Sequence, residues 1–288
     1  MKTINTLVAD IYKLMSTKEV PEGVDTEKAI DDFGEAVKSL MRKEFTNPYK
    51  DKRTLRLSNI GRSDRYLWNV VHGTEKEEIA PHTYVKFMYG HLIEEMLLCL
   101  TKLSGHTVTD EQKKCEVNGI VGSMDCKIDG IVTDVKSTST FGFKKFKDGT
   151  LAKDDPFGYI AQIKAYAHSE GETEYGWLAM DKQNGHLTYL KYDEKDTTAP
   201  MYEHLNWSIE ERVEHLKKIV GLAEPQTFCA DPVPDGASGN LKLSTTCSYC
   251  QYKDHCHPEL RTFLYSSGPR FLTKVVKLPK VAELTDDW

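Results

Sequence analysis

Two aspartates and a lysine lie close together in a region rich in short β-prone runs. Asp134 and Lys136 are two residues apart, so in a strand their side chains leave the same face. Asp125 lies on the run that should pair with theirs across the Asp129-Gly130 turn. Carboxylates gathered in this way suit Mg²⁺ or Mn²⁺, which keep waters that a substrate phosphate can replace. The lysine could orient or deprotonate a water; an ordinary surface beside a turn is the alternative.

A third carboxylate is expected inside the helix that the apolar pattern predicts over residues 84–103. This segment is apolar nearly all round, so we expect the helix to be buried. An unpaired carboxylate there would cost several kcal/mol, and a bound metal ion would remove that cost. Glu94 is preferred to Glu95 because Gly90 lies one turn before it and leaves room for a close approach.

The segment 156–169 returns to helical spacing and places Tyr159, Gln162 and Tyr166 on one face. Gln162 can both donate and accept hydrogen bonds, and a tyrosine ring can stack on a base or cap a phosphate. This polar and aromatic face indicates nucleic acid as the substrate. A half-exposed helix with a tyrosine in the core is the alternative.

A basic segment, STSTFGFKKFKDG, follows the Asp-x-Lys run at residues 137–149. Three phenylalanines alternate with three lysines in it, among them Lys144 and Lys145. Beside the carboxylates these lysines could hold a nucleic-acid backbone, and a ring could stack on an unpaired base. Solvated lysines over packed phenylalanines are the alternative.

Three of the seven cysteines form a C-x2-C-x5-C cluster that a histidine follows at once. A C-x2-C turn lets two thiolates bind one metal ion, and soft sulfur selects zinc or an iron–sulfur cluster. The ligands that we expect are Cys247, Cys250, Cys256 and His257. His255 or Cys229 could instead supply the fourth ligand. We favour zinc over an iron–sulfur cluster, and a metal-free segment is the alternative.

The predicted elements give an α/β fold whose core could bring these residues together. Its order is a helix at 84–103, a three-stranded meander at 107–136, a helix at 156–169 and a hairpin at 174–191, with a further helix at 208–223. Helices at 3–15 and 25–45 form an added layer before it. We therefore expect a helical extension at 1–54, a core at 55–225, a cysteine-containing segment at 226–265 and a tail at 266–288.

Composition limits the class of protein. The chain has 288 residues, 39% of them hydrophobic and 28% charged, and its formal charge is 38 − 44 = −6. No run reaches the roughly eighteen apolar residues that a membrane span needs, so no membrane partner is expected. The first residues lack the unbroken apolar stretch of a secretion signal. With an odd number of cysteines, these features predict a cytoplasmic protein.

Four short motifs resemble, in order and spacing, those of the PD-(D/E)XK nuclease superfamily. They are Gly90 to Glu94, Gly122-Ser123-Met124-Asp125, Asp134-Val135-Lys136 and Gln162-Ile163-Lys164-Ala165-Tyr166. The last is similar to the Gln-x-x-x-Tyr signature of the RecB-like branch, which includes CRISPR-associated and phage exonucleases. The resemblance covers residues 55–260.

The resemblance implies a restriction-endonuclease-like core and a role for each motif. Mg²⁺ or Mn²⁺ would be held by Glu94, Asp125, Asp134 and the carbonyl of Val135. Lys136 would position the attacking water, and Gln162 and Tyr166 would contact the substrate. RecB-like members commonly have histidine where Glu94 stands, so the match is to their glutamate-using relatives, and His91 is not expected to be a ligand.

The cysteine segment resembles the C-terminal part of the iron–sulfur staple in related nucleases. The first cysteine of that staple precedes the nuclease motifs, and Ser63 stands at that place here. This departure is the reason that zinc is favoured.

The resemblance therefore implies a metal-dependent deoxyribonuclease, an exonuclease or flap-trimming enzyme in phage or bacterial DNA replication, recombination or degradation. It would work in the cytoplasm of a bacterium, or of an infected host if the gene belongs to a phage. Its expected partners are DNA, single-stranded or with free ends, and replication or recombination proteins. The alternatives are a nucleic-acid-binding module without catalysis and a structural subunit of a helicase–nuclease complex.

Overall fold

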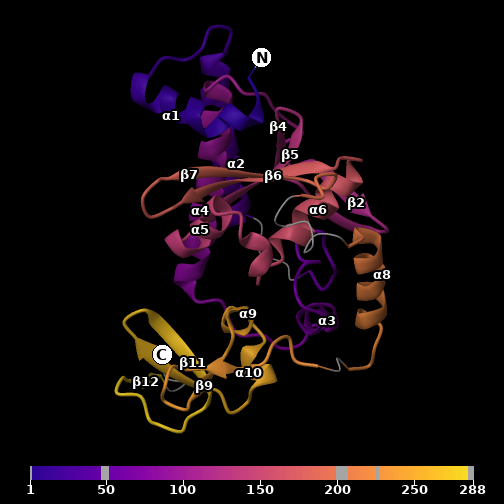
Figure 1. Ribbon diagram of the computed structural model, residues 1–288, viewed down its shortest axis with the longest axis vertical. Coiled ribbons are helices and arrows are strands. Elements are labelled where there is room, and N and C mark those ends of the chain that lie inside the picture. Colours follow the sequence, from indigo (N-terminus) through magenta and orange to yellow (C-terminus); the bar gives the residue numbers. More distant parts are fainter. Residues whose placement is uncertain (1, 47–51, 199–206, 225–226, 285–288) are drawn as a thin grey trace. The chain divides into compact units, whose positions relative to one another are not determined.

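The computed structural model describes residues 2–46, 52–198, 207–224 and 227–284 (Figure 1). These residues belong to two compact units, one drawn from 1–51, 56–61 and 81–213 and the other from 52–55, 62–80 and 214–288. The division differs from the four segments expected from the sequence. None of the helices in the described part of the chain combines the length and the apolar composition that a membrane span requires.

The first unit is built on a mixed sheet with the strand order β1-β4-β5-β6-β7. Its strands are β1 (Val108–Thr109), β4 (Cys126–Ile128), β5 (Ile131–Thr138), β6 (Glu174–Asp181) and β7 (Leu187–Asp193). Only the β5–β6 pair in this sheet is parallel. A separate hairpin consists of β2 (Lys114–Val117) and β3 (Ile120–Ser123). The predicted mixed α/β class is therefore confirmed.

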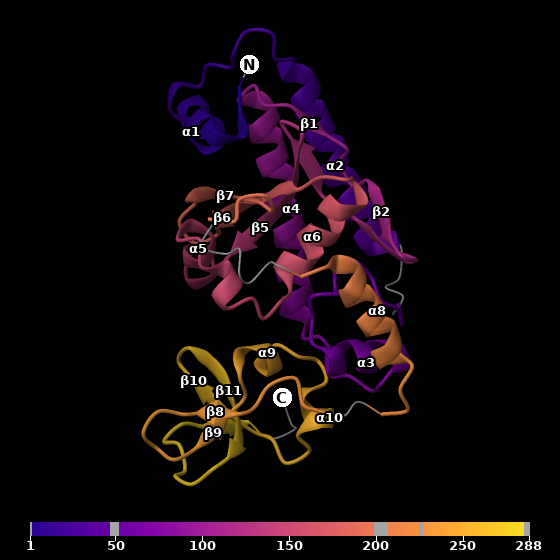
Figure 2. The same cartoon turned by 45° about the vertical axis from the view of Figure 1, so that its right-hand side comes forward.

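Helices surround this sheet in the first unit. They are the 3₁₀ turns Ile4–Thr6 and Leu151–Lys153 and the α-helices α1 (Leu7–Thr17), α2 (Thr26–Thr46), α4 (Pro81–Leu103), α5 (Thr140–Lys147) and α6 (Tyr159–Ser169), together with the start of α8 (Ile209–Val220). Helix α2 packs along α4, as Figures 1 and 2 show.

The turns of the predicted meander are present, but its strands differ from the prediction. The residues Asn118, Gly119, Asp129 and Gly130 all have positive φ values, 46°, 80°, 51° and 86°. Positive φ at both central residues is the requirement of a type I′ hairpin turn. The region contains five strands rather than three. Strands β1, β4 and β5 belong to the main sheet, whereas β2 and β3 lie between β1 and β4 in the sequence and form a hairpin of their own.

Alternate residues of β5 face different layers of the first unit. Val135 packs in a hydrophobic cluster with Leu97 of α4 and Leu7 of α1. Asp134 and Lys136 leave the opposite face, and Lys136 meets Tyr159 of α6 there. Helix α1 therefore supplies part of the core of this unit and is not a layer added outside it.

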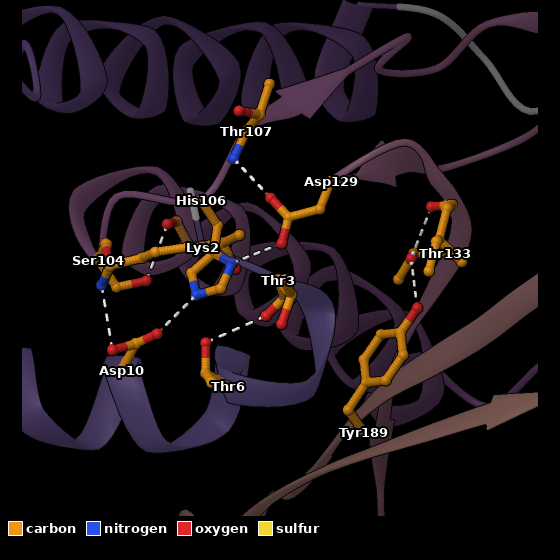
Figure 3. Close-up of polar contacts among 12 residues, drawn as sticks. Lys2, Thr3, Thr6, Asp10, Ser104, His106, Thr107, Asp129, Thr133 and Tyr189 are labelled. Atoms are coloured by element: carbon orange, nitrogen blue, oxygen red, sulfur yellow. Dashed lines mark hydrogen bonds and ion pairs between the residues drawn. The ribbon is translucent and has the colours of Figure 1, made fainter.

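A buried histidine ties α1 to the sheet (Figure 3). Nδ1 of His106 lies 2.7 Å from Oδ2 of Asp129, and Nε2 lies 3.1 Å from Oδ2 of Asp10 on α1. Lys2 is paired with Asp10 at 3.1 Å and donates to the carbonyl of Ser104. The N-terminal residues are thereby held to the chain that leaves α4 and to the β4–β5 turn.

Helix α4 is buried only in its second half, so the prediction of a fully buried helix is wrong. Ile93 and Leu97 are buried, whereas Tyr84, Phe87 and Tyr89 are exposed. The apolar composition reports which residues could be buried, but not which of them have a neighbouring element to pack against.

Helix α6 begins where two backbone segments meet. A Cβ atom on Gly158 would lie 2.3 Å from the carbonyl carbon of Gly61, which is too close for any side chain. Gly158 also has φ +76°, in the left-handed region that favours glycine. This contact fixes the start of the helix that carries the Gln-x-x-x-Tyr motif.

The second unit contains α3 (Asp64–His72) and an antiparallel sheet with the order β12-β10-β11-β9-β8. Its strands are β8 (Val233–Pro234), β9 (Leu241–Lys242), β10 (Arg261–Tyr265), β11 (Gly268–Lys274) and β12 (Glu283–Leu284), with the short helices α9 (Thr245–Ser248) and α10 (Lys253–Cys256). Strands β11 and β12 lie within the segment 266–288 that was expected to be a tail; residues 285–288 lie outside the described part.

Candidate active site

Asp134 and Lys136 form an ion pair at the middle of β5. Asp134 is 1% exposed, and Nζ of Lys136 lies 2.9 Å from each of its carboxylate oxygens, donating a hydrogen bond to Oδ1. The same ammonium lies 4.7 Å from the ring centroid of Tyr159 on α6. Lys136 is thus held between a carboxylate and an aromatic face.

Asp125 precedes β4 and lies opposite Asp134 if the Cys126–Thr133 register is continued by one residue. Its Oδ2 accepts a hydrogen bond of 2.8 Å from the backbone N–H of Val135. Burial, followed by the negative charges of Asp134 and Glu94, raises the pKa of Asp125. Burial also raises the pKa of Asp134, although the positive charge of Lys136 opposes this rise.

Lys136 supplies positive charge to this group. Burial by itself lowers the pKa of Lys136, but the carboxylates of Asp134 and Asp125 outweigh it and raise the pKa above its ordinary value. Lys136 is therefore an ammonium at neutral pH, which can donate hydrogen bonds and cannot accept a proton.

The charge of Glu94 on α4 acts on both aspartates, and a loop residue is hydrogen-bonded to the Glu94 side chain. Nε2 of Gln112 donates to Oε1 of Glu94 at 3.0 Å, and the backbone N–H of Gln112 donates to the carbonyl of Asp125 at 2.9 Å. His91 Nδ1 lies 3.8 Å from Oε2 of Glu94. A Cβ atom on Gly90 would lie 3.6 Å from Oγ of Ser137, an ordinary contact, so the approach of α4 does not require glycine.

Gln162 and Tyr166 lie on the face of α6 that was expected, and they differ in exposure. Tyr166 is 1% exposed and its ring packs against Gly122 of β3. Its hydroxyl is hydrogen-bonded to Gln162, which is partly exposed. Burial, followed by the charge of Asp134, raises the pKa of Tyr166. Gln162 is the member of the pair that a ligand can reach.

The basic segment forms α5, directly after β5. Lys144 is exposed, whereas Lys145 is bonded to Oδ2 of Asp154 at 2.6 Å and to its carbonyl at 2.9 Å. Nζ of Lys145 also lies 5.2 Å from the ring centroid of the exposed Phe141. The two lysines are therefore not equivalent, and Lys144 is the one available to a phosphate.

The oxygens at β5 have the chemistry of a hard-cation site, although they are engaged by other groups. Oδ2 of Asp134 is buried, and the ammonium of Lys136 lies 2.9 Å from it. Within those residues, no three His, Cys, Asp or Glu side chains are gathered closely enough to hold a metal ion. Each of the three carboxylates accepts a hydrogen bond from a protein group: Glu94 from Gln112, Asp125 from the N–H of Val135 and Asp134 from Lys136.

The cysteine segment of the second unit forms a tight turn. The N–H of Cys250 donates to the carbonyl of Cys247 at 3.0 Å, and the N–H of Tyr252 donates to the sulfur of Cys250 at 3.4 Å. Burial, with the nearby thiols of Cys229 and Cys256, raises the pKa of Cys250 to about 11.

Cys229 and His257 differ in the residues with which they interact. Burial raises the pKa of Cys247, and the nearby thiols of Cys229 and Cys256 contribute to this rise. The N–H of Ala230 donates a hydrogen bond to the sulfur of Cys247. The ring of His257 instead stacks on Phe228, with centroids 5.2 Å apart and planes at 14°.

Two positioning residues were missed by the sequence analysis. Gln112 joins Glu94 to Asp125, and it lies in a polar loop with φ 54° that gives no signal of this role. Asp155 accepts the N–H groups of residues 158, 159 and 160 at 2.9 to 3.0 Å and so caps α6. An aspartate shortly before a helical pattern is a recognisable capping signal.

No protein-family model and no curated protein matches this chain. Among solved structures, the alkaline exonuclease LHK-Exo from Laribacter hongkongensis is 15% identical, with a TM-score of 0.35 over 59% of this chain and 90% of that one. Its complex with dAMP gives a TM-score of 0.33 over 59% and 91%. The protein SSO0001 is 12% identical, with a TM-score of 0.37 over 76% and 93%. These values assign neither a family nor an activity.

Proposed function

We propose that this protein is a metal-dependent deoxyribonuclease of the PD-(D/E)XK type, in its RecB-like branch. One observation carries the proposal. The buried Asp134 is paired with the ammonium of Lys136, and the charge of Glu94 contributes to the raised pKa of both Asp134 and the partly buried Asp125. Three carboxylates that act on one another beside a lysine suit the hydrolysis of a phosphodiester.

In this proposal Glu94, Asp125, Asp134 and the carbonyl of Val135 would hold Mg²⁺ or Mn²⁺, after the carboxylates move closer together than they stand. A bound divalent ion would supply Lewis-acid stabilisation of the negative charge that develops on the phosphate. Carboxylate and carbonyl oxygens are the ligands that these hard cations prefer, which supports this set. Lys136 and Gln112 are the partners that Asp134 and Glu94 would have to exchange for the ion.

The other residues of the site would bind the substrate and orient the reacting groups. Lys136 donates a hydrogen bond to the attacking water or to a phosphate oxygen, and Tyr159 limits where its ammonium can move. Gln162 contacts the substrate, while the buried Tyr166 holds the Gln162 side chain in place. Lys144 on α5 binds a phosphate of the DNA backbone.

Digestion of end-labelled DNA tests the proposed function. Linear single strands, linear duplexes and circular single strands are incubated with Mg²⁺, with Mn²⁺ or with EDTA. We expect cleavage with either metal ion and none with EDTA; linear DNA degraded from its ends with intact circles would identify an exonuclease. Absence of cleavage of every substrate in both metals would contradict the proposal.

Substitutions on α6 separate a substrate contact from a core residue. Gln162→Ala should slow cleavage about ten- to a hundredfold, on the order of 1.4 to 2.8 kcal/mol, with an unchanged melting temperature. Tyr166→Ala should lower the melting temperature because it empties a buried site, whereas Tyr166→Phe should keep it and lose only the bond to Gln162. Cleavage rates and melting curves are measured on the same samples. Wild-type cleavage rates in both Gln162→Ala and Tyr166→Phe would show that α6 does not contribute to the active site.

We further propose zinc at the cysteine segment, with Cys229, Cys247, Cys250 and Cys256 as ligands that would have to move closer together than they stand to hold the ion. The hydrogen bond from Tyr252 to the sulfur of Cys250 and that from Ala230 to Cys247 support thiolate binding in this turn. Four thiolates match the ligand set of a structural zinc site. His257, the ligand expected from the sequence, is the competing fourth group.

The purified protein should contain about one zinc ion per chain by elemental analysis. Cys250→Ser should lose the zinc and melt at a lower temperature, because the ion closes this segment. Cys229→Ser should also lose it and His257→Ala should retain it, while Cys99→Ser in the first unit serves as the control. Stoichiometric iron and sulfide would show that the choice of zinc is wrong.

A further inference from the structure

The first half of α4 carries exposed side chains on the helix face that also carries Glu94. Tyr84, Phe87, His91 and Glu94 are spaced by three, four and three residues, so they form one row along the helix. Phe87 is 53% exposed and Tyr84 is 42% exposed, and His91 is exposed as well. We call Tyr84, Phe87 and His91 the aromatic row.

The aromatic row runs along one face of α4 toward Glu94 of the candidate active site. The rings of Tyr84 and Phe87 meet edge to face with centroids 6.4 Å apart. His91 lies 3.8 Å from Glu94. With a helical rise of about 1.5 Å per residue, Phe87 is about 10 Å and Tyr84 about 15 Å from Glu94 along the axis. This is the length of a few stacked nucleotides, at about 3.4 Å each.

We propose that the aromatic row binds the unpaired bases of the DNA strand that enters the active site. The inference rests on the proposed nuclease function and names its substrate as a single strand or a single-stranded end. Unpaired bases expose their faces to aromatic rings, whereas paired bases in a duplex cover the faces of one another. Stacking on rings is also tolerant of sequence, as degradation of arbitrary DNA requires.

The charge of the protein makes stacking, rather than attraction of phosphates, the source of affinity in this proposal. The chain has a net charge of −6, and the three carboxylates of the candidate site, which are part of that total, repel a phosphate backbone. The exposed rings of the aromatic row do not serve the core, which α4 reaches through Ile93 and Leu97 instead. Binding through rings should depend less on salt than binding through lysines.

The opposite face of α4 offers a matched control. Tyr89 is five residues from Tyr84, which turns it away from the aromatic row, and it is similarly exposed at 46%. Tyr84→Ala and Tyr89→Ala therefore remove the same side chain from the same helix, on two faces. Phe87→Leu removes the ring face but keeps an apolar side chain of similar reach.

Fluorescence anisotropy with a labelled single strand and a labelled blunt duplex, in buffer with EDTA, tests the inference without cleavage. The double variant Tyr84→Ala, Phe87→Ala should bind the single strand about ten- to a hundredfold more weakly. Its affinity for the blunt duplex should change less than about twofold, and Tyr89→Ala should match the wild type on both. Phe87→Leu should bind the single strand as weakly as Phe87→Ala.

Several results would overturn the inference: unchanged binding of the single strand, an equal loss on the duplex, or an equal loss in Tyr89→Ala. A change of oligomeric state in sedimentation, with unchanged DNA binding, would assign the aromatic row to a contact with a second copy of the chain. Failure of the nuclease proposal looks different, because the wild type would then bind the single strand through the row but cleave no DNA. Where cleavage occurs, hydrolysis of the p-nitrophenyl ester of thymidine 5′-phosphate, too short to reach Phe87, should be equal in wild type and double variant.

Discussion

Asp134→Asn is expected to abolish DNA cleavage while leaving the protein folded. The substitution keeps the size of the side chain and an oxygen that can accept from Lys136, but it removes the buried negative charge at the centre of the site. Without that charge the divalent ion is held weakly and the phosphate is not fixed in line with the attacking water. We expect a loss of about a thousandfold or more, on the order of 4 kcal/mol in the barrier.

The measurement pairs initial cleavage rates in Mg²⁺ with thermal melting of the same preparation. The melting temperature should not fall by more than a few degrees, because the substitution also removes the repulsion between Asp134 and Asp125, and Asp125 remains as a countercharge for the Lys136 ammonium. Asp148→Asn, at the exposed end of α5, is the matched control and should cleave like the wild type. Full activity in a folded Asp134→Asn preparation would exclude the assignment of this site.

The parts of the site that could be predicted depend on short-range patterns. The Asp129-Gly130 dipeptide prescribes a type I′ turn, and that turn sets the register that brings Asp125 opposite Asp134. The two-residue period of a strand then places Lys136 on the same face as Asp134. A spacing of four residues likewise places Gln162 and Tyr166 together on α6. These relations need no knowledge of distant segments.

The parts that could not be predicted depend on contacts between distant segments. Gln112 reaches Glu94 only because the loop after β1 folds back on α4, and nothing in the local sequence requires this. The close approach of Gly61 to Gly158 is equally invisible, since each glycine alone indicates only a turn. The apolar residues of α4 are divided between the core and solvent by the elements that surround them. Strand β11 pairs with β10 across a turn that was interpreted as part of a tail.

Lys136→Ala should lose most of the activity and still bind the metal ion. The ammonium of Lys136 is held at 2.9 Å from Asp134 and 4.7 Å from the centre of the Tyr159 ring, so a hydrogen-bond donor is kept at one place beside the carboxylates. Its removal takes away the donor but none of the oxygens that hold the ion. We expect cleavage to fall about a hundred- to a thousandfold, on the order of 3 to 4 kcal/mol.

Metal binding distinguishes the role of Lys136 from that of Asp134. In a titration with Mn²⁺ followed by electron paramagnetic resonance, Lys136→Ala should bind the ion at least as tightly as the wild type, since the variant lacks the positive charge that competes for the oxygens of Asp134. Asp134→Asn should bind it more weakly. Lys136→Arg restores the charge with a wider, planar group and should recover only part of the rate, because the guanidinium cannot occupy the position of the ammonium between Asp134 and Tyr159. Loss of Mn²⁺ binding in Lys136→Ala would instead show that the lysine maintains the arrangement of the carboxylates, and the donor role would then have to be given to another residue.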